Sequence, residues 1–528
     1  MTQTEQTDTE RLRWLTEQLL VRDVDVHATA IDALAEEGDE RVVPHLVELL
    51  VIGSIANDWE RFGFPAALRS HDPPRYLELP EVRWPGVRDA LAALAEPDFD
   101  SDHAWVEWES WYSQQEIEPL DGFDEWKLRL FRSYLPPVGG LLDCEPREFD
   151  LQEIRWGNCD RSFLAALNGP RFVPGEAIDA SAGSDQASDE AFDKNDETER
   201  SSDEGDAPER YLEDDHVVFG FEIEGTAYAV PRWVLFPHEL LNAELQGVPV
   251  SLTYCTLCNA PILYDRRLPT VGDEDGDDAN GSVGGVADGS ADTVADVRTF
   301  GSTGMLASGN KVMYDEETET LWDQHSGTPI GGPELESDPD LFLDQFAVTQ
   351  TEWGEWKAEY PDTLALNVDT GYGYDYSYYD GNVDFFEHYW NREEIVQPGV
   401  RRAEDGPLPE KASVYGVVDD DPAGVWVVSI DDLRERDVPL LEGVVAGRKV
   451  VVTLDATDDV AVYEAPSTTV ERVDDEDGIA LVDADGTRWT LTRNELRSDD
   501  GRIRTRIPGR HGLWFAFRTH YETAYVIE

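Results

Sequence analysis

The chain has few cysteines and few basic residues for its length. Its 528 residues include four Cys and 42 Lys and Arg, against 112 Asp and Glu. Four cysteines do not make a disulfide framework, so any cysteine chemistry is local and the thiols of a protein in a reducing compartment stay reduced. A formal net charge of -70 without a long Lys/Arg cluster disfavours nucleic acid and anionic lipid as partners. We therefore expect neither to bind.

Long apolar segments are missing as well. No run of about 18 apolar residues occurs, and the stretch 1–10 is polar and acidic, without a basic flank before an apolar core. We expect no membrane span, no secretion signal and a cytoplasmic location. The sequence also lacks a Walker loop, a dinucleotide-binding glycine fingerprint, a His-Glu-x-x-His helix and a nucleophile elbow. The commonest enzyme signatures are therefore excluded.

The acidic excess is the strongest compositional signal. Carboxylates at this density repel one another and destabilise the compact state unless counterions screen them, and the Debye length falls to about 3 Å in molar salt. A disordered acidic chain is excluded because 40% of the residues are hydrophobic and 16 are Trp. We expect a folded protein that needs high salt, typical of a halophilic archaeon with a multimolar-salt cytoplasm.

Hydrophobic periodicity divides the chain into a helical region over 1–150 and a larger domain over 152–528. In the first, apolar residues recur at helical spacing, and "HATAIDALAEEGDERVVPHLVELL" resembles a single HEAT-type helical repeat. Because a repeat stack normally needs three or more units, a short helical adaptor and a plain helical bundle are both open. Such a region offers a surface for a protein partner.

The larger domain changes to short β-type runs from Val217 onward, and turn residues bound most of them. The runs include "VVFGFEIEGTAYAV", "VPVSLTYC" and "NKVMYD", and the clearest helix is Trp353 to Tyr360. Two tracts of Ser, Asp, Glu and Gly, 179–209 and 271–296, are predicted to be disordered loops. The expected fold class is α+β, with a helical N-terminal region followed by a mainly β main domain.

Five sequence blocks follow one another along this domain: "RWGNCDRSFLAALNGPRFVPGEA", "AVPRWVLFPHELLNAELQGVPVSLTYCTLCNAPILYDR", "FGSTGMLASGNKVMYDEETETLWDQHSGTPIGG", "TEWGEWKAEYPDTLAL" and "GLWFAFRTHYETAYV". Their order and spacing resemble the family called domain of unknown function 3179, over 152–528 without the two acidic tracts. The resemblance implies a fold lineage and no particular activity. Family members often read Cys-Pro-Leu-Cys-Gly and carry export signals, whereas Thr256 and Asn259 replace the Pro and Gly here; Asn is the next best residue at positive φ.

One block contains a C-x-x-C motif, Cys255 and Cys258, directly after the strand-like run 248–254. Pro261 lies so close behind that a helix is disfavoured, which separates this motif from the thioredoxin arrangement. A turn between strands lets both sulfurs point to one side, as in half of a tetrahedral thiolate site. The motif favours a zinc or copper(I) site, with dithiol redox chemistry and buried structural thiols as the alternatives.

A half-site needs further ligands, and no second C-x-x-C occurs. His238, in "WVLFPHEL", is the preferred third ligand because it precedes the same strand, and His325, in "LWDQHSG", is the weaker choice. A lone His is more often a hydrogen-bonded core or surface residue. The block "MYDEETETLWDQHSGTPI" predicts a hairpin, in which turn and core roles are favoured over a ligand pocket. Its pocket candidates are Tyr314, Asp315, Trp322 and Gln324.

These features lead to hypotheses of different classes. The first is a metal- or thiol-dependent enzyme, or a metal-handling domain, centred on the C-x-x-C turn and carrying a helical adaptor. The second is a non-catalytic module that binds a protein or another ligand through aromatic side chains and the helical region. The third is a structural protein without a small-molecule site.

Overall fold

The computed structural model describes most of the chain and omits several segments. The described residues are 3–61, 84–95, 97, 99, 105–157, 161, 165–180, 210–268, 296–372, 376, 390, 393, 395, 399–400, 406–418, 424–445, 447–466, 469–475, 478–521 and 523–527, with the side chains of 3–7 and 55–61 excepted. The two predicted acidic loops, apart from 179–180 and 296, lie outside these residues.

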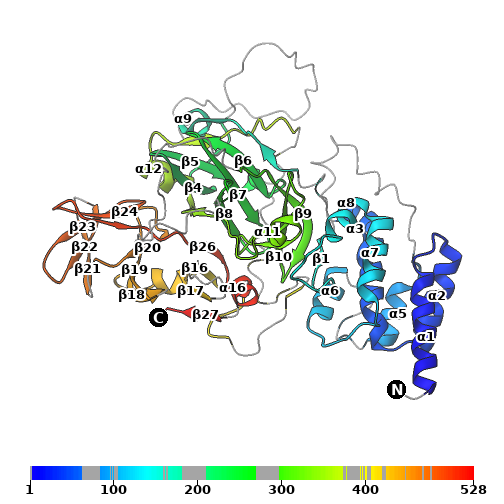
Figure 1. Ribbon diagram of the computed structural model, residues 1–528. Helices are drawn as coiled ribbons and strands as arrows, with labels where there is room; N and C mark the ends of the chain where they lie inside the picture. The colour runs from blue at the N-terminus through cyan, green and yellow to red at the C-terminus, as the bar shows by residue number, and fades with distance from the viewer. Residues whose placement is uncertain are drawn as a thin grey trace, which may run out of the picture.

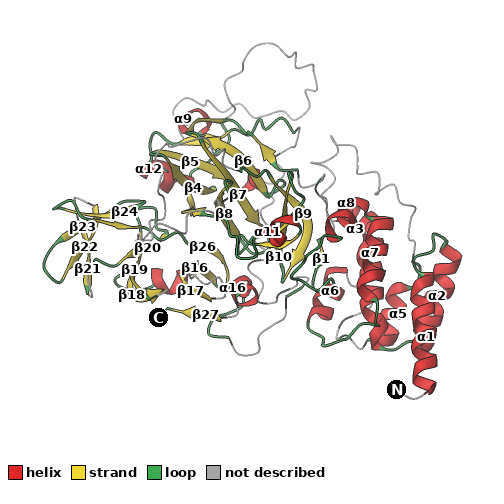
Figure 2. Ribbon diagram, in the orientation of Figure 1, coloured by secondary structure: helices red, strands yellow, loops and turns green. Residues whose placement is uncertain are grey.

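The described part of 1–150 is helical, as the sequence predicts, and its helices lie together at one end of the molecule (Figures 1 and 2). Side-chain capping explains where one of them begins: Asp23 accepts hydrogen bonds from the N–H groups of Asp25 and Val26. The bounds are α1 Gln3–Gln18, α2 Val24–Glu37, α3 Val43–Arg61, α5 Val87–Leu94, α6 Trp105–Ser113, α7 Phe123–Tyr134 and α8 Pro136–Leu142, with a short 3-10 turn at Glu40–Val42.

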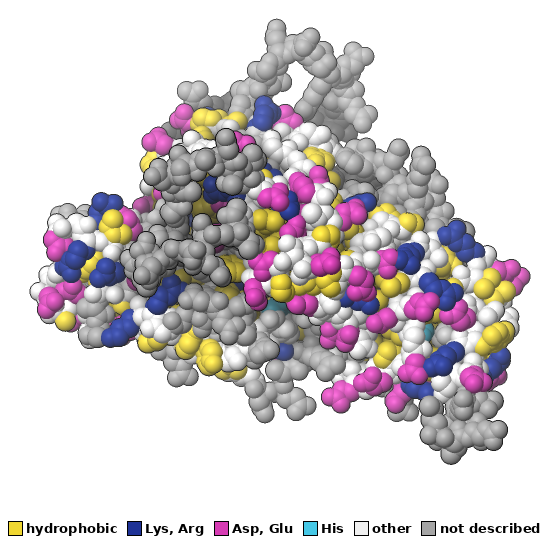
Figure 3. Space-filling view, in the orientation of Figure 1, with side chains coloured by type: hydrophobic (Ala, Val, Ile, Leu, Met, Phe, Trp, Pro, Cys, Tyr) yellow, Lys and Arg dark blue, Asp and Glu magenta, His cyan; other side chains and the backbone are white. Residues whose placement is uncertain are grey.

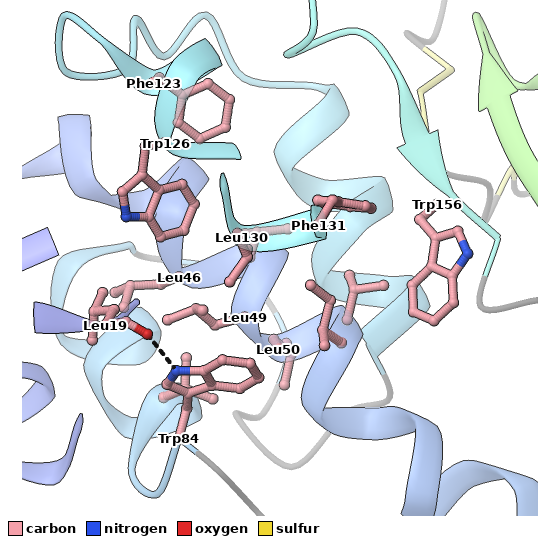
Figure 4. Close-up of a cluster of buried hydrophobic side chains, with 14 of the residues drawn as sticks. Leu19, Leu46, Leu49, Leu50, Trp84, Phe123, Trp126, Leu130, Phe131 and Trp156 are labelled. Carbon is pink, nitrogen blue, oxygen red and sulfur yellow. Dashed lines mark hydrogen bonds between the residues drawn. The ribbon is translucent and has the colours of Figure 1, made fainter. Parts of the chain in front are cut away.

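A hydrophobic core fills the space between these helices (Figure 4). Leucines of α3 pack against aromatic rings, and the indole N–H of Trp84 donates to the carbonyl of Leu19 at 3.2 Å. The same cluster includes Trp156 and Met305, which belong to strands of the β domain. The helical region and the β domain therefore share one core.

Among the described residues, the central part of the β domain forms three five-stranded sheets, with strand orders β1-β9-β10-β11-β12, β13-β8-β7-β6-β2 and β14-β4-β5-β15-β3. Short helices connect or flank them: α9 Gly175–Ile178, α10 Arg232–Leu235, α11 Pro333–Ser337 and α12 Trp353–Glu359. The strands are β1 Arg155–Trp156, β2 Leu167–Asn168, β3 Phe172–Pro174, β4 Val217–Ile223, β5 Thr226–Pro231, β6 Leu240–Leu245, β7 Val248–Cys255, β8 Ala260–Asp265, β9 Phe300–Ala307, β10 Asn310–Asp315, β11 Leu321–Asp323, β12 Pro329–Gly331, β13 Gln345–Phe346, β14 Thr349–Glu352 and β15 Leu364–Leu366.

The C-terminal part adds three smaller sheets, with orders β26-β16-β17-β27, β18-β19-β20 and β21-β22-β23-β24-β25. The chain runs away from the central sheets and then returns to them through β26 and α16 (Figure 1). The elements are β16 Ser413–Val418, β17 Gly424–Ser429, α15 Ile430–Arg434, β18 Leu440–Val445, β19 Arg448–Leu454, β20 Val460–Glu464, β21 Val470–Asp475, β22 Gly478–Asp483, β23 Arg488–Leu491, β24 Glu495–Ser498, β25 Ile503–Thr505, β26 Arg510–Leu513, α16 Trp514–His520 and β27 Thr523–Val526. The predicted α+β class, helical first and mainly β afterwards, is confirmed.

The described surface carries many carboxylates, as the acidic composition predicts. Carboxylates are scattered among Lys and Arg over the described part of the face in Figure 3, on the helical region and the central sheets alike. Among the described residues, none of the helices combines the length and the apolar character that a membrane crossing requires.

Candidate functional site

The C-x-x-C motif forms the turn between β7 and β8. Cys255 is the last residue of β7 and lies opposite Ala260, the first residue of β8. Asn259, at the end of the turn, has a φ of 49°. This is the left-handed region that Asn tolerates better than most residues, which explains how Asn stands where the family often has Gly. The predicted strand-to-strand turn is present.

Both cysteines of the turn are buried and free of disulfide bonds. Burial and the charge of Glu239 would raise the pKa of Cys255. Hydrogen bonds to its sulfur from the Cys258 side chain and from the backbone of Cys258 and Lys311 outweigh them and hold the pKa below its ordinary value. The Cys258 sulfur also lies 3.5 Å from the carbonyl oxygen of Gly309. The turn between β9 and β10 therefore closes over the cysteine pair.

A buried ion pair interacts electrostatically with Cys255. His520, the last residue of α16, donates from Nδ1 to the carbonyl of Ala516 at 2.7 Å, and its Nε2 lies 3.4 Å from Oδ2 of Asp323. Burial would lower the pKa of His520, but the charges of Asp323 and of Cys255 and the bond to Ala516 raise it. Burial would raise the pKa of Asp323, and His520 lowers it instead. The imidazolium and the carboxylate stabilise each other.

His325 lies against this pair. Its ring stacks on that of His520 with centroids 5.1 Å apart, and its Nδ1 is 3.2 Å from the hydroxyl of Tyr521. Burial and the positive charges of His520 and Arg510 lower the pKa of His325 well below its ordinary value, so its ring is neutral. The other nitrogen, Nε2, is buried and has no hydrogen-bond partner among the described residues.

Gln324 links this turn to the strand that carries Cys255. Its Nε2 donates to Oγ1 of Thr253 at 2.8 Å and to the carbonyl of Ala260 at 3.1 Å. Thr253 is two residues before Cys255 on β7, so both side chains point to the same face of the sheet. Gln324 is fully buried, and its Oε1 has no partner in the described part of the chain.

Lys311 is held by the loop that precedes β6. Its Nζ donates to the carbonyl of Glu239 at 2.6 Å and lies 3.7 Å from Oε2 of the same residue. That oxygen also accepts from Oγ of Ser302 at 3.1 Å. Burial raises the pKa of Glu239, and Lys311 and Ser302 oppose the rise. The network fixes the side chain of Lys311, whose backbone N–H points at the Cys255 sulfur.

His238, the preferred third metal ligand, makes other bonds. Its Nδ1 is 2.7 Å from the carbonyl of Ala165, and its Nε2 is 2.5 Å from the hydroxyl of Tyr376. Both ring nitrogens are thus engaged in hydrogen bonds. No group of three or more His, Cys, Asp or Glu side chains within the described segments is arranged to hold a metal ion. A zinc or copper(I) site built on His238 remains a prediction.

The other hairpin candidates divide into two groups. Asp315 and Trp322 are fully buried and bonded to each other, with Trp322 Nε1 donating to Asp315 Oδ2 at 2.9 Å, and Asp315 also accepts from the N–H of Thr318. They close the hairpin, which is the turn and core role favoured from the sequence. Tyr314 is partly buried with its ring against Gly301. Gln324 bonds to Ala260 at the end of the cysteine turn, whereas His325 packs against His520.

Sequence reasoning missed three contributors, His520, Asp323 and Lys311. All three lie inside the quoted blocks, in "FRTHYE", "LWDQH" and "GNKVMY". Their position inside the blocks that resemble the family is the signal that could have identified them.

Comparison with known proteins gives a family and no activity. No curated protein and no solved structure matches the chain. The family described as Protein of unknown function (DUF3179) matches residues 195–524, well over half of the chain. Cys255, Cys258, Asp323, His325 and His520 all fall within that range. The chain belongs to the DUF3179 family.

Proposed function

We propose that this protein is a thiol-dependent oxidoreductase whose Cys255 and Cys258 exchange with a disulfide substrate. The observation that carries the proposal is the set of hydrogen bonds that converge on the Cys255 sulfur. Because the thiolate is the nucleophilic form of cysteine, donors that stabilise it prepare Cys255 to attack. His520, which pairs with Asp323 and interacts electrostatically with Cys255, is the proposed proton donor.

The reaction begins at Cys255. Its thiolate attacks one sulfur of the substrate disulfide, the substrate S–S bond breaks, and a mixed disulfide forms on Cys255. His520 protonates the departing thiolate and becomes neutral. It then takes the proton of Cys258, whose sulfur attacks that of Cys255 and expels the second substrate thiolate, which His520 protonates in turn. The substrate gains two electrons and two protons, and the Cys255–Cys258 dithiol is oxidised to a disulfide.

Metal binding is the second use that the same thiols could serve. Cys255 and Cys258 would provide two sulfur ligands for zinc or copper(I), and any further ligands would come from outside the described residues, since no third His, Cys, Asp or Glu among them completes such a group. Both uses would make the thiols essential, so the experiment must separate them.

The test is disulfide exchange in molar KCl with bis(hydroxyethyl) disulfide, a small neutral probe. We expect the wild-type protein to release two thiols per molecule and to acquire a Cys255–Cys258 disulfide, seen by peptide mass spectrometry. Cys258→Ser should stop at the mixed disulfide on Cys255, and Cys255→Ser should not react. Cys144→Ser is the control and should behave as wild type, because burial raises the pKa of the Cys144 thiol to about 11.

Elemental analysis of the same samples completes the test. Equal reactivity of the Cys255→Ser and wild-type proteins would overturn the redox proposal. Stoichiometric zinc or copper in the wild-type protein, lost in the Cys255→Ser/Cys258→Ser variant and coupled to unreactive thiols, would also overturn it and support the metal site.

A further inference from the structure

Three fully buried polar side chains in the strands and turns next to the cysteine turn each leave one atom unbonded. Asn310, Gln324 and His325 are each 0% exposed. Among the described residues, Oδ1 of Asn310, Oε1 of Gln324 and Nε2 of His325 have no hydrogen-bond partner. Buried polar atoms are nearly always paired in folded proteins, with protein, water or a ligand, so these three atoms need an explanation.

The contacts of Asn310 and Gln324 connect both residues to neighbours of Cys255, and His325 follows Gln324 in the chain. The backbone N–H of Gln324 and Nδ2 of Asn310 both donate to the carbonyl of Lys311, at 3.3 and 3.4 Å. The N–H of Lys311 in turn donates to Cys255. The Gln324 amide also bonds to Ala260, the residue paired with Cys255 across the hairpin.

The hydrogen bonds of Asn310 and Gln324 identify which atom of each side-chain amide is left unbonded. Gln324 Nε2 faces two acceptors, the Ala260 carbonyl and Oγ1 of Thr253, whose own proton goes to the carbonyl of Ile262 at 3.2 Å. Asn310 Nδ2 likewise faces a carbonyl, that of Lys311. The unbonded atoms are therefore both carbonyl oxygens, which accept hydrogen bonds and cannot donate them. The neutral ring of His325 can accept or donate at Nε2, depending on its tautomer.

We propose that Asn310, Gln324 and His325 form a subsite beside Cys255 that binds an N–H-bearing group of the substrate, such as a peptide or primary amide next to the disulfide. This inference rests on the proposed function and names its substrate class. A group with two N–H donors satisfies both amide oxygens at once, whereas an ester or an ether of the same shape leaves them buried and unpaired. A site built to hydrogen-bond a substrate group rejects the analogue that lacks it.

The experiment compares two disulfides of nearly equal size, dithiobis(propanamide) and the dimethyl ester of dithiodipropionic acid. Each rate constant for thiol release is divided by that of the same probe with free dithiothreitol, which removes intrinsic reactivity. We expect wild-type protein to prefer the amide by about 10-fold or more. In Asn310→Leu the ratio of the amide rate to the ester rate should fall towards one. Asn310→Ala removes the same oxygen with a smaller side chain and serves if the leucine variant does not fold.

The outcomes separate this inference from the function on which it rests. Equal normalised rates for both probes in the wild-type protein would overturn the subsite, and a water molecule would then be the partner of these atoms. Exchange with neither probe would overturn the proposed function itself. An amide preference that persists in both Asn310 variants would also contradict the subsite.

Discussion

Among single residues, Glu109 carries the clearest pH dependence. It is fully buried on α6, where the helical region meets the β domain, and its Oε2 lies 3.3 Å from Nε of Arg155. Burial raises the pKa of Glu109 to about 7; Arg155 and Lys127 oppose the rise and Glu48 adds to it. The carboxyl thus binds its proton more tightly in the folded protein than in the unfolded chain.

Replacing Glu109 by Gln should remove this pH dependence. Between the ordinary pKa of 4.5 and about 7 the folded state binds more protons than the unfolded state, so stability falls as pH rises through that window. We expect Glu109→Gln to match wild type near pH 4.5 and to exceed it at pH 8 by on the order of 1 to 3 kcal/mol. Urea unfolding in molar KCl, followed by Trp fluorescence, measures the difference.

The control for this prediction is Glu125→Gln, at an exposed position on α7. Its stability should follow the wild-type curve at every pH. Parallel curves for wild type and Glu109→Gln would contradict the prediction.

The residues of the site were only partly predictable from the sequence. The cysteine turn could be predicted because Cys255, Cys258 and Pro261 are neighbours in the chain, so local backbone rules apply. His520 could not, since its contact with Asp323 joins residues far apart in sequence. His238 was preferred for its position just before β7, but its nitrogens bond to Ala165 and Tyr376. The position of His238 in the sequence did not indicate which residues its imidazole ring contacts.

Among the elements, the contact between β16 and α16 positions His520. Gly416 lies in the middle of β16, and a Cβ at this residue would lie 2.2 Å from Cε1 of Phe517. The backbone of Gly416 does not have a positive φ, so its conformation does not require glycine. The glycine is needed for space, because it lets α16 approach the sheet.

Gly416→Ala should therefore overpack this contact. We expect a loss of about 1 to 3 kcal/mol in stability and slower exchange at Cys255, since α16 must shift and carries His520 at its end. Gly140→Ala on α8 is the matched control: a Cβ there meets nothing within 4 Å. That change should be neutral or stabilise by up to about 1 kcal/mol, as Ala favours helix over Gly. A Gly416→Ala protein with wild-type melting temperature and exchange rate would contradict the prediction.

Elements themselves were more predictable than their pairing. The runs "VPVSLTYC" and "NKVMYD" correspond to β7 and β10, and the predicted helix from Trp353 is α12. Alternation and turn residues are local signals, which explains these matches. The parallel pairing of β15 with β5 follows from packing in three dimensions, and no local pattern encodes it.

For the whole molecule, the formal net charge of -70 decides the behaviour in salt. The described surface in Figure 3 carries carboxylates on the helical region and on the central sheets. These carboxylates repel one another, and their repulsion opposes the packing of the two parts around their shared core. Screening controls that repulsion, because the Debye length grows from about 3 Å at 1 M salt to about 10 Å at 0.1 M.

We expect the urea midpoint of unfolding to fall steeply between 1 M and 0.1 M KCl, followed by far-ultraviolet circular dichroism. Sucrose is the decisive control, because it favours burial of surface as an excluded solute and screens no charge. Sucrose added at 0.1 M KCl should restore little of the lost stability, whereas NaCl at equal ionic strength should restore most of it. Full recovery in sucrose would show that solute exclusion stabilises the fold, and an unchanged midpoint at low salt would show that the carboxylates do not limit its stability.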